Sequence, residues 1–161
     1  MHNLQHYLLH PRFIALLSGL IFPLAIAPFF IWPIVIISLI GLLFSLTNAT
    51  HKEAAIRTWL FGFGKFSVGV SWIYVSMHTH GGTPAVLASI MVGLFAAFLA
   101  TFPALFIYIF HRFYNQKNTQ TIIAIFAFAS LWFLYEWFRS WFMTGFPWLF
   151  AGDAQLHTWL N

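Results

Sequence analysis

Long apolar runs without charge constrain this chain more than any other feature. No Asp, Glu, Lys, Arg or His lies between Phe13 and Leu46, although one membrane-spanning helix needs only about 20 apolar residues. Hydrophobic residues make up 61% of the 161-residue chain and charged residues 6%, which leaves too few polar side chains to cover a soluble protein. We therefore predict an all-α integral membrane protein, because a helix satisfies its own backbone hydrogen bonds in lipid.

Prolines and short polar segments divide the apolar sequence into about five expected spans. Three prolines between residues 23 and 33 interrupt the first run, and proline kinks or ends a helix, so this run is expected to form a helical hairpin. Polar connections at 47–57, 78–84 and 112–120 separate the later spans. The predicted spans are about 12–28, 33–47, 57–76, 85–110 and 121–140.

The placement of Lys and Arg predicts how the bundle is oriented. Basic residues occur near the start of the chain and in the second and fourth connections, whereas the first and third connections have none. Basic loops remain on the cytoplasmic side of a membrane. We therefore expect a cytoplasmic arm at residues 1–11, a transmembrane domain at 12–149 and an outer tail at 150–161. The basic residues that set this orientation are Arg12, Lys52, Arg57, Arg112 and Lys117.

The last predicted span ends in LYEWFRSWFMTGFPWLF (134–150), which places charge at the end of an apolar helix. Glu136 and Arg139 lie three residues apart on one helical face, where opposite charges can pair. The Gly-Phe-Pro sequence that follows is expected to stop the helix, since proline cannot continue it and glycine permits a sharp exit. Two interpretations stay open. The pair either closes the helix end and sets its depth, or shapes a surface for lipid headgroups or a further domain.

Tryptophan gathers on the predicted outer side of the bundle. Trp and Tyr favour membrane–water interfaces, so we expect a broad aromatic platform there, joined by the charged helix end. We assign contact with lipid or with a further domain to nine residues of this face. They are Trp72, Tyr74, Glu136, Trp137, Arg139, Trp141, Gly145, Pro147 and Trp148.

Lys65 is unusual because it lies about 12 Å into the third predicted span, at about 1.5 Å of rise per residue. Gly62 and Gly69 share its helical stripe, and small residues on a stripe allow another helix to approach closely. We expect Lys65 to face the bundle and its ammonium group to reach towards the cytoplasmic side. A structural role is the simpler interpretation, and a functional role is the alternative.

Several kinds of chemistry are excluded or weakly supported by the residues present. The chain has no cysteine, which excludes disulfides, zinc–thiolate sites and a cysteine nucleophile within it. His78 and His80 make a weak ligand pair in a loop, so no metal and no cofactor are predicted. There is no G-x-S-x-G motif and Asp153 is the only aspartate, so no nucleophile with its base is recognised. The scattered basic residues also form no nucleic-acid surface.

Four segments together resemble the N-terminal membrane region of bacterial apolipoprotein N-acyltransferases. They are WPIVIISLIGL (32–42), GFGKFSVGVSWIYVS (62–76), HGG (80–82) and EWFRSWFMTGFPW (136–148). The match runs through all five expected spans in order and covers nearly the whole chain. Lys65 and His80 depart from the pattern, since an apolar and an aromatic residue are expected there.

The resemblance implies an inner-membrane, multi-pass enzyme with a periplasmic functional face. Such an enzyme transfers an acyl chain from a phospholipid donor to the N-terminal diacylglyceryl-cysteine of lipoproteins. In this family a nitrilase-like domain performs the chemistry with a Glu-Lys-Cys triad and a thioester intermediate. That domain is expected to begin shortly after residue 161, so no catalytic residue is assigned here. The chain alone is expected to be an inactive, truncated fragment that needs the nitrilase-like domain as a partner.

Two other interpretations remain open on the sequence. The first is a non-catalytic membrane protein that binds lipid or a partner through its outer aromatic face. This shares every compositional feature of the acyltransferase fragment, and only a nitrilase-like domain encoded downstream would separate them. The second is a membrane subunit that binds haem or a metal through histidines, although no histidine lies in the middle of a predicted span.

Overall fold

The computed structural model describes residues 10–113, 121–142 and 145–156, and in these ranges it contains α-helices and shorter helical turns but no strand. The predicted all-α class is therefore confirmed. Six α-helices are present in the described part, joined by 3₁₀ turns at Phe22–Ala25 (η1) and Ala151–Gln155 (η5) and a π turn at Ser76–His80 (η2). The α-helices are α2 (Pro11–Ile21), α3 (Pro33–Ser45), α4 (His51–Gly69), α5 (Ser71–Val75), α6 (Ala85–Phe113) and α7 (Thr121–Trp141).

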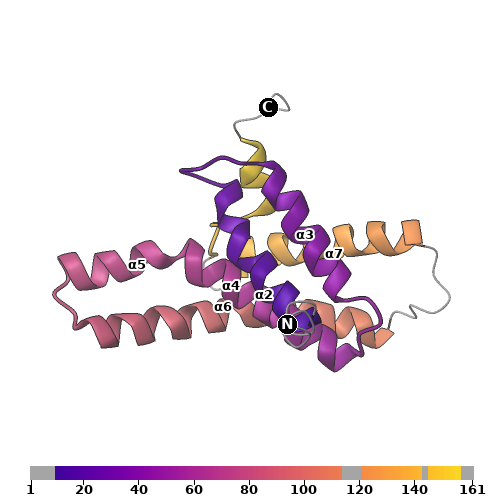
Figure 1. Cartoon of the computed structure of the whole chain (residues 1–161), viewed down its shortest axis with the longest axis horizontal. Helices are drawn as coiled ribbons and strands as arrows, with labels where there is room; N and C mark the ends of the chain where they lie inside the picture. The colour runs from indigo at the N-terminus through magenta and orange to yellow at the C-terminus, as the bar shows by residue number, and fades with distance from the viewer. Residues whose placement is uncertain (1–9, 114–120, 143–144, 157–161) are drawn as a thin grey trace, which may run out of the picture.

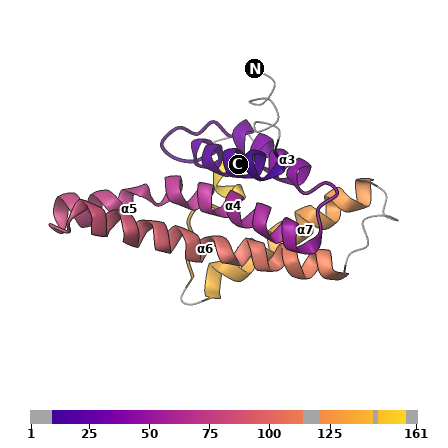
Figure 2. The same ribbon diagram turned by 60° about the horizontal axis from the view of Figure 1, so that its bottom comes forward.

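The centre of the fold is an antiparallel pair of long helical segments. Helix α4, continued by α5, runs beside α6 along its length, and the α2–α3 hairpin crosses this pair (Figure 1). Seen after a 60° turn, the hairpin forms a separate layer on one side of α4 (Figure 2). Helix α7 lies beside the C-terminal half of α6, so that its own C-terminal end reaches the middle of α4.

Among the described helices, two are long and apolar enough to cross a membrane. They are Ala85–Arg112 in α6, with a mean hydropathy of 2.3, and Ile122–Trp141 in α7, with 1.4. The hairpin contains the shorter apolar helices Pro11–Ala25 and Pro33–Ser45. The segment predicted as the third span is divided at Val70, whose backbone (φ −104°, ψ 11°) separates α4 from α5.

Helix α4 begins at His51, within the segment expected to be a polar connection. Thr50 is the reason, because its side-chain oxygen accepts a hydrogen bond from the Glu53 N–H at 3.3 Å and so caps the helix. Glu53 in turn pairs with Arg12 of α2 and with Arg57 of its own helix. The hydrogen bond from Arg12 lowers the pKa of the Glu53 carboxyl below its usual value. These contacts join the N-terminal ends of α2 and α4.

Glycines allow α4 to pack closely on both sides. A Cβ at Gly64 would lie 2.8 Å from the Leu16 carbonyl oxygen of α2, and one at Gly62 would lie 3.0 Å from the Cα of Ala100 in α6. The prediction that Gly62 permits close approach of another helix is confirmed. Gly69 instead faces Leu149, which follows α7. Backbone contact of this kind is how helices pack where burial of apolar area gives little driving force.

Candidate functional site

The C-terminal half of α7 carries two charged side chains into the protein. Arg139 is 2% exposed, and the Glu136 side chain is 13% exposed. Both lie on the stripe of α7 that also carries Trp132 and Tyr135, which belong to the apolar core. A charge in such surroundings is stable only when it is paired or hydrogen-bonded, so the partners of these two residues define what they do.

The Glu136 carboxylate binds groups from three different parts of the chain. It accepts hydrogen bonds from the indole N–H of Trp132 at 3.0 Å and from the backbone N–H of Ala151 at 2.9 and 3.2 Å. Its Oε1 lies 3.7 Å from the Nζ of Lys65 in α4. Glu136 therefore connects α7 to α4 and to the chain that returns after α7.

The Arg139 guanidinium binds the same returning chain. Its Nη1 donates to the carbonyl oxygens of Phe146 at 2.7 Å and Trp148 at 2.8 Å. Its Cζ lies 4.5 Å from the centre of the Phe150 ring, within the range of a cation–π contact. We call residues 145–151 the return segment.

The prediction that Glu136 pairs with Arg139 is wrong. Among the described residues no ion pair joins these side chains, and the nearest cation to Glu136 is Lys65. The physical reason is that the return segment offers partly buried backbone groups that need partners. Arg139 satisfies carbonyl oxygens and Glu136 satisfies an N–H, so the two side chains bind different ends of the segment.

The chain reverses after α7 as the Gly-Phe-Pro sequence predicts. Gly145 has φ +80°, a conformation that favours glycine, and a Cβ there would overlap the Ser140 carbonyl. The Phe146 N–H donates to the Arg139 carbonyl at 3.1 Å, which satisfies an otherwise free group at the helix end. Thr144 of the same motif lies outside the described residues. The reversal directs the return segment towards α4 and α6.

The return segment brings Trp148 to Trp72. Their ring centres are 6.0 Å apart, and each side chain is about half exposed. Behind them, Leu149 packs on Gly69 of α4, and the Phe146 ring lies 5.4 Å from that of Phe95 in α6. The structure thus joins two residues of the predicted aromatic platform that are far apart in sequence.

The other residues of the predicted platform occupy separate positions. Trp137 and Trp141 form their own exposed pair on α7, with ring centres 5.6 Å apart. Tyr74 is half-buried and lies against the ring of His78. Pro147 is exposed in the return segment.

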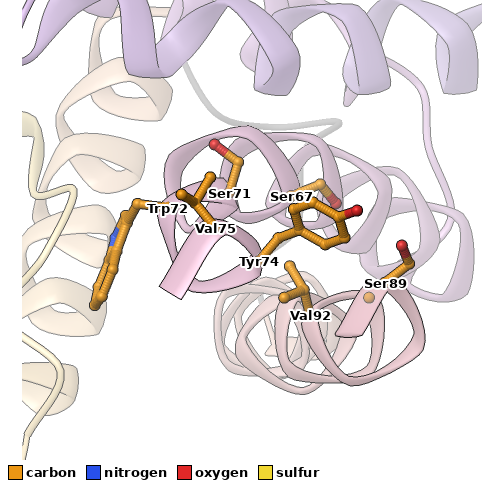
Figure 3. Close-up of a pocket in the computed structure, with 8 residues that line it drawn as sticks. Ser67, Ser71, Trp72, Tyr74, Val75, Ser89 and Val92 are labelled. Atoms are coloured by element: carbon orange, nitrogen blue, oxygen red, sulfur yellow. The ribbon is translucent and has the colours of Figure 1, made fainter. Parts of the chain in front are cut away.

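A groove of about 520 Å³ opens between α4–α5 and α6, and we call it the α5–α6 groove. Figure 3 shows Tyr74 extending between Ser67 and Val92, whereas Trp72 points to the opposite side of α5. The Ser67 hydroxyl donates to the Phe63 carbonyl at 2.6 Å and that of Ser89 to Ala85 at 2.9 Å. The lining residues are Ser67, Ser71, Trp72, Tyr74, Val75, Ser89, Val92 and Gly93.

Only part of this groove was predicted from the sequence. Trp72 and Tyr74 were expected at the outer surface, whereas the serines were not assigned to a site. A signal was available, because Ser67, Ser71 and Tyr74 lie at positions i, i+4 and i+7, which share one face of a helix. The α6 side, including Gly93, carries no comparable pattern. The groove is therefore an apolar surface with hydroxyl groups on both walls, Ser89 being the one on α6, and no charged side chain among its lining residues.

Lys65 is 1% exposed and contacts other helices, which confirms that it faces the bundle. The expectation that the side chain extends out of the bundle, towards the cytoplasmic side, is wrong, since Nζ is buried 3.9 Å from the centre of the Phe22 ring, beside Glu136. His78 Nδ1 lies 2.8 Å from the Thr83 carbonyl oxygen. Within the described ranges, no three His, Cys, Asp or Glu residues gather in a way that could hold a metal ion. His2, His6 and Lys117 lie outside the described residues.

Replacing Arg139 tests its role in holding the return segment. We expect Arg139→Met to lower the free energy of unfolding by about 3 kcal/mol, because two carbonyl oxygens lose hydrogen bonds to a charged group. Arg139→Lys should lower the free energy of unfolding by less, since lysine keeps the positive charge. Denaturant unfolding in detergent micelles measures both. Arg112→Met, at an exposed position of α6, is the control and should change little. Equal stability of Arg139→Met and the unaltered chain would contradict this role.

The family profile and similar known proteins indicate the same family for this chain. The profile of the apolipoprotein N-acyltransferase N-terminal domain matches residues 18–161. Proteins named apolipoprotein N-acyltransferase are 43% identical in Pseudomonas syringae and 46% in Pseudomonas aeruginosa, each over 143 residues and 89% of this chain. The one from Vibrio cholerae is 38% identical over 154 residues and 95% of this chain.

The chain covers only part of these relatives. It spans 28% of the two Pseudomonas proteins and 30% of the Vibrio protein. The predicted resemblance is confirmed, and it extends over nearly the whole chain. The chain belongs to the family of the apolipoprotein N-acyltransferase N-terminal domain.

Proposed function

We propose that this chain is the membrane-embedded N-terminal part of an apolipoprotein N-acyltransferase and that it holds the lipid substrate. The observation that carries the lipid-holding role is the α5–α6 groove, an apolar surface with neutral hydroxyl groups on both walls. Its volume of about 520 Å³ lies within the range of small-molecule sites in proteins. Apolar residues such as Val75 and Val92 suit an acyl chain. The hydroxyls of Ser71 and Tyr74 suit the oxygens of an ester, whereas those of Ser67 and Ser89 donate to their own helices.

The exposed Trp72–Trp148 pair supports a place for the groove at a membrane surface. Indole rings favour the headgroup region, because one part of the ring is apolar and the N–H is polar. Trp72 lines the groove, and Trp148 lies against Trp72. A phospholipid with an acyl chain along the groove would then have its headgroup at the level of this pair, whose Trp72 ring points to the other side of α5. The outer platform named from the sequence thus contributes Trp72 and Tyr74 to the lining of the proposed lipid site, and Trp148 lies against Trp72.

We further propose about five spans in the bacterial inner membrane, with a cytoplasmic N-terminus. The two long apolar helices support a membrane location. The basic ends of α4 and α6 lie together, as the contact of the His51 and Tyr108 rings at 5.4 Å indicates, and this end holds Lys52 and Arg112. The opposite end, at His78–Gly82, has no Lys or Arg. This asymmetry is what cytoplasmic and outer ends should show.

The acyl-transfer chemistry is proposed to belong to a nitrilase-like domain on the periplasmic side. The chain covers less than a third of its relatives' length and contains no cysteine. The thioester mechanism that the family resemblance implies needs a cysteine nucleophile. By itself the chain is therefore proposed to be inactive. The lipoprotein substrate and the nitrilase-like domain are its proposed partners.

Complementation tests this proposal in cells depleted of their own N-acyltransferase. The chain is expressed alone, or together with the remaining part of a relative as a second polypeptide. We expect growth to be restored only when both are present. Growth with this chain alone would contradict its proposed inactivity. Failure of the pair, despite insertion of both polypeptides in the membrane, would contradict the acyltransferase role and favour a non-catalytic lipid-binding protein.

Filling the groove should reduce lipid binding. Gly93 lines the groove, and a Cβ there would have no atom within 4 Å, so Gly93→Phe places a ring in open space. We expect the amount of phospholipid retained through purification to fall several-fold, as measured by mass spectrometry. Leu94→Phe is the matched control, because the neighbouring Leu94 is 66% exposed and does not line the groove. Equal retention by the two variants would contradict a lipid site in the groove.

A further inference from the structure

We propose that Lys65 is a positioning residue for the α5–α6 groove, acting through Glu136 and the return segment. Lys65 balances the Glu136 charge inside the protein, which allows that carboxylate to hold Ala151 and so keeps Trp148 against Trp72. The proposed effect of Lys65 on lipid binding rests on the proposed function of the groove. The proposed effect of Lys65 on the position of the return segment is independent of that function.

Lys65 lies in largely apolar surroundings, where Glu136 is its ion-pair partner among the described residues. Its ammonium group is buried and has no hydrogen-bond partner, and it lies 3.9 Å from the Phe22 ring and 5.2 Å from the Trp132 ring. Moving an ammonium ion out of water costs several kcal/mol, and contacts with aromatic rings recover only part of that. The nearest opposite charge is Glu136, 3.7 Å away. Lys65 thus acts as a charge partner in the interior.

Glu136 passes this effect to the return segment. Its Oε1 accepts the hydrogen bonds from the Trp132 indole N–H and from the Ala151 N–H, and the same oxygen lies 3.7 Å from the Lys65 Nζ. A carboxylate left without a positive partner here would be strongly disfavoured. It would then take up a proton or turn towards water, and either change weakens its hydrogen bond with Ala151.

The return segment passes the effect to the groove. Its far end is held at Ala151 by Glu136, and its middle is held at Trp148 by Arg139. Between these points Leu149 packs on Gly69, and Trp148 lies against Trp72, a lining residue of the groove. Loss of the hydrogen bond at Ala151 would therefore loosen the part of the return segment that packs on α4, next to Trp72.

Charge balance distinguishes this role from simple packing. Removing one partner of a buried ion pair leaves an isolated charge and is strongly destabilising, whereas replacing both with neutral residues is often harmless. Lys65→Met and Glu136→Gln alone should therefore each disturb the segment. The double variant Lys65→Met/Glu136→Gln should recover, because the glutamine oxygen can still accept from Ala151. Lys65 acting by its bulk alone would give no such recovery.

A disulfide between α4 and the return segment provides the measurement. The chain has no cysteine of its own, and an ideal Cβ at Gly69 lies 3.0 Å from the Leu149 Cγ. Cysteines at positions 69 and 149 therefore come close to the Cβ separation of a disulfide. We would introduce Gly69→Cys and Leu149→Cys together and follow the rate of bond formation with a mild oxidant, in the membrane. Lys52→Met, at an exposed position of α4, is the control.

We expect Lys65→Met and Glu136→Gln to slow bond formation at least several-fold, the double variant to return close to the starting rate, and Lys52→Met to have no effect. Phospholipid retention should follow the same order. The proposal would be overturned if every variant formed the disulfide as fast as the chain that carries only the two cysteines. It would also be overturned if the double variant formed the bond as slowly as the single variants. If the single variants fail to insert, the double variant alone decides, because it is expected to insert and to form the bond. If the unaltered chain retains no phospholipid, the proposed lipid site in the groove is contradicted. The rates of disulfide formation would still test the link from Lys65 to the return segment.

Discussion

The energetic cost of charge inside an apolar protein is the constraint on which this structure depends. Lys65 and Arg139 are almost completely buried and Glu136 is largely buried, and each can persist only because another part of the chain satisfies it. Glu136 and Arg139 find those partners in the return segment and Lys65 finds its partner in Glu136. The charges therefore bring α4 together with α7 and the return segment, from which it is distant in sequence.

Close backbone contact supplies the frame in which these charges meet. Gly64 allows α4 to touch α2, and Gly62 allows it to touch α6, so that α4 lies between the hairpin and the longest helix. This placement turns Lys65 inward and directs Ser67, Ser71 and Tyr74 along the groove. The return segment then covers α4 beyond Gly69. Scaffold and site thus both depend on the α4–α5 segment, which presents small residues, a charge and hydroxyl groups.

The sequence predicts most of the local structure and little of the pairing. Apolar runs and prolines indicate the helices, and the glycine and proline after α7 predict the chain reversal, because both depend on residues close together. The partner of Glu136 could not be found in this way. A spacing of three residues favours Arg139, whereas the true partner, Lys65, is set by how α4 packs against α7. The serine stripe of the groove is visible as a helical pattern, but nothing in the sequence shows that α6 forms its other wall.

Labelling with a photoactivatable phospholipid tests the central claim, that the α5–α6 groove holds lipid. The probe carries its reactive group in an acyl chain, and labelled residues are identified by peptide mass spectrometry after irradiation in membranes. We predict preferential labelling at Ser67–Val75 and Ser89–Gly93, above the level at the outward-facing apolar residues Ile37, Ile40 and Phe44 of α3, which are 57–65% exposed. Labelling of the groove no stronger than that of this outer face of α3 would contradict the claim.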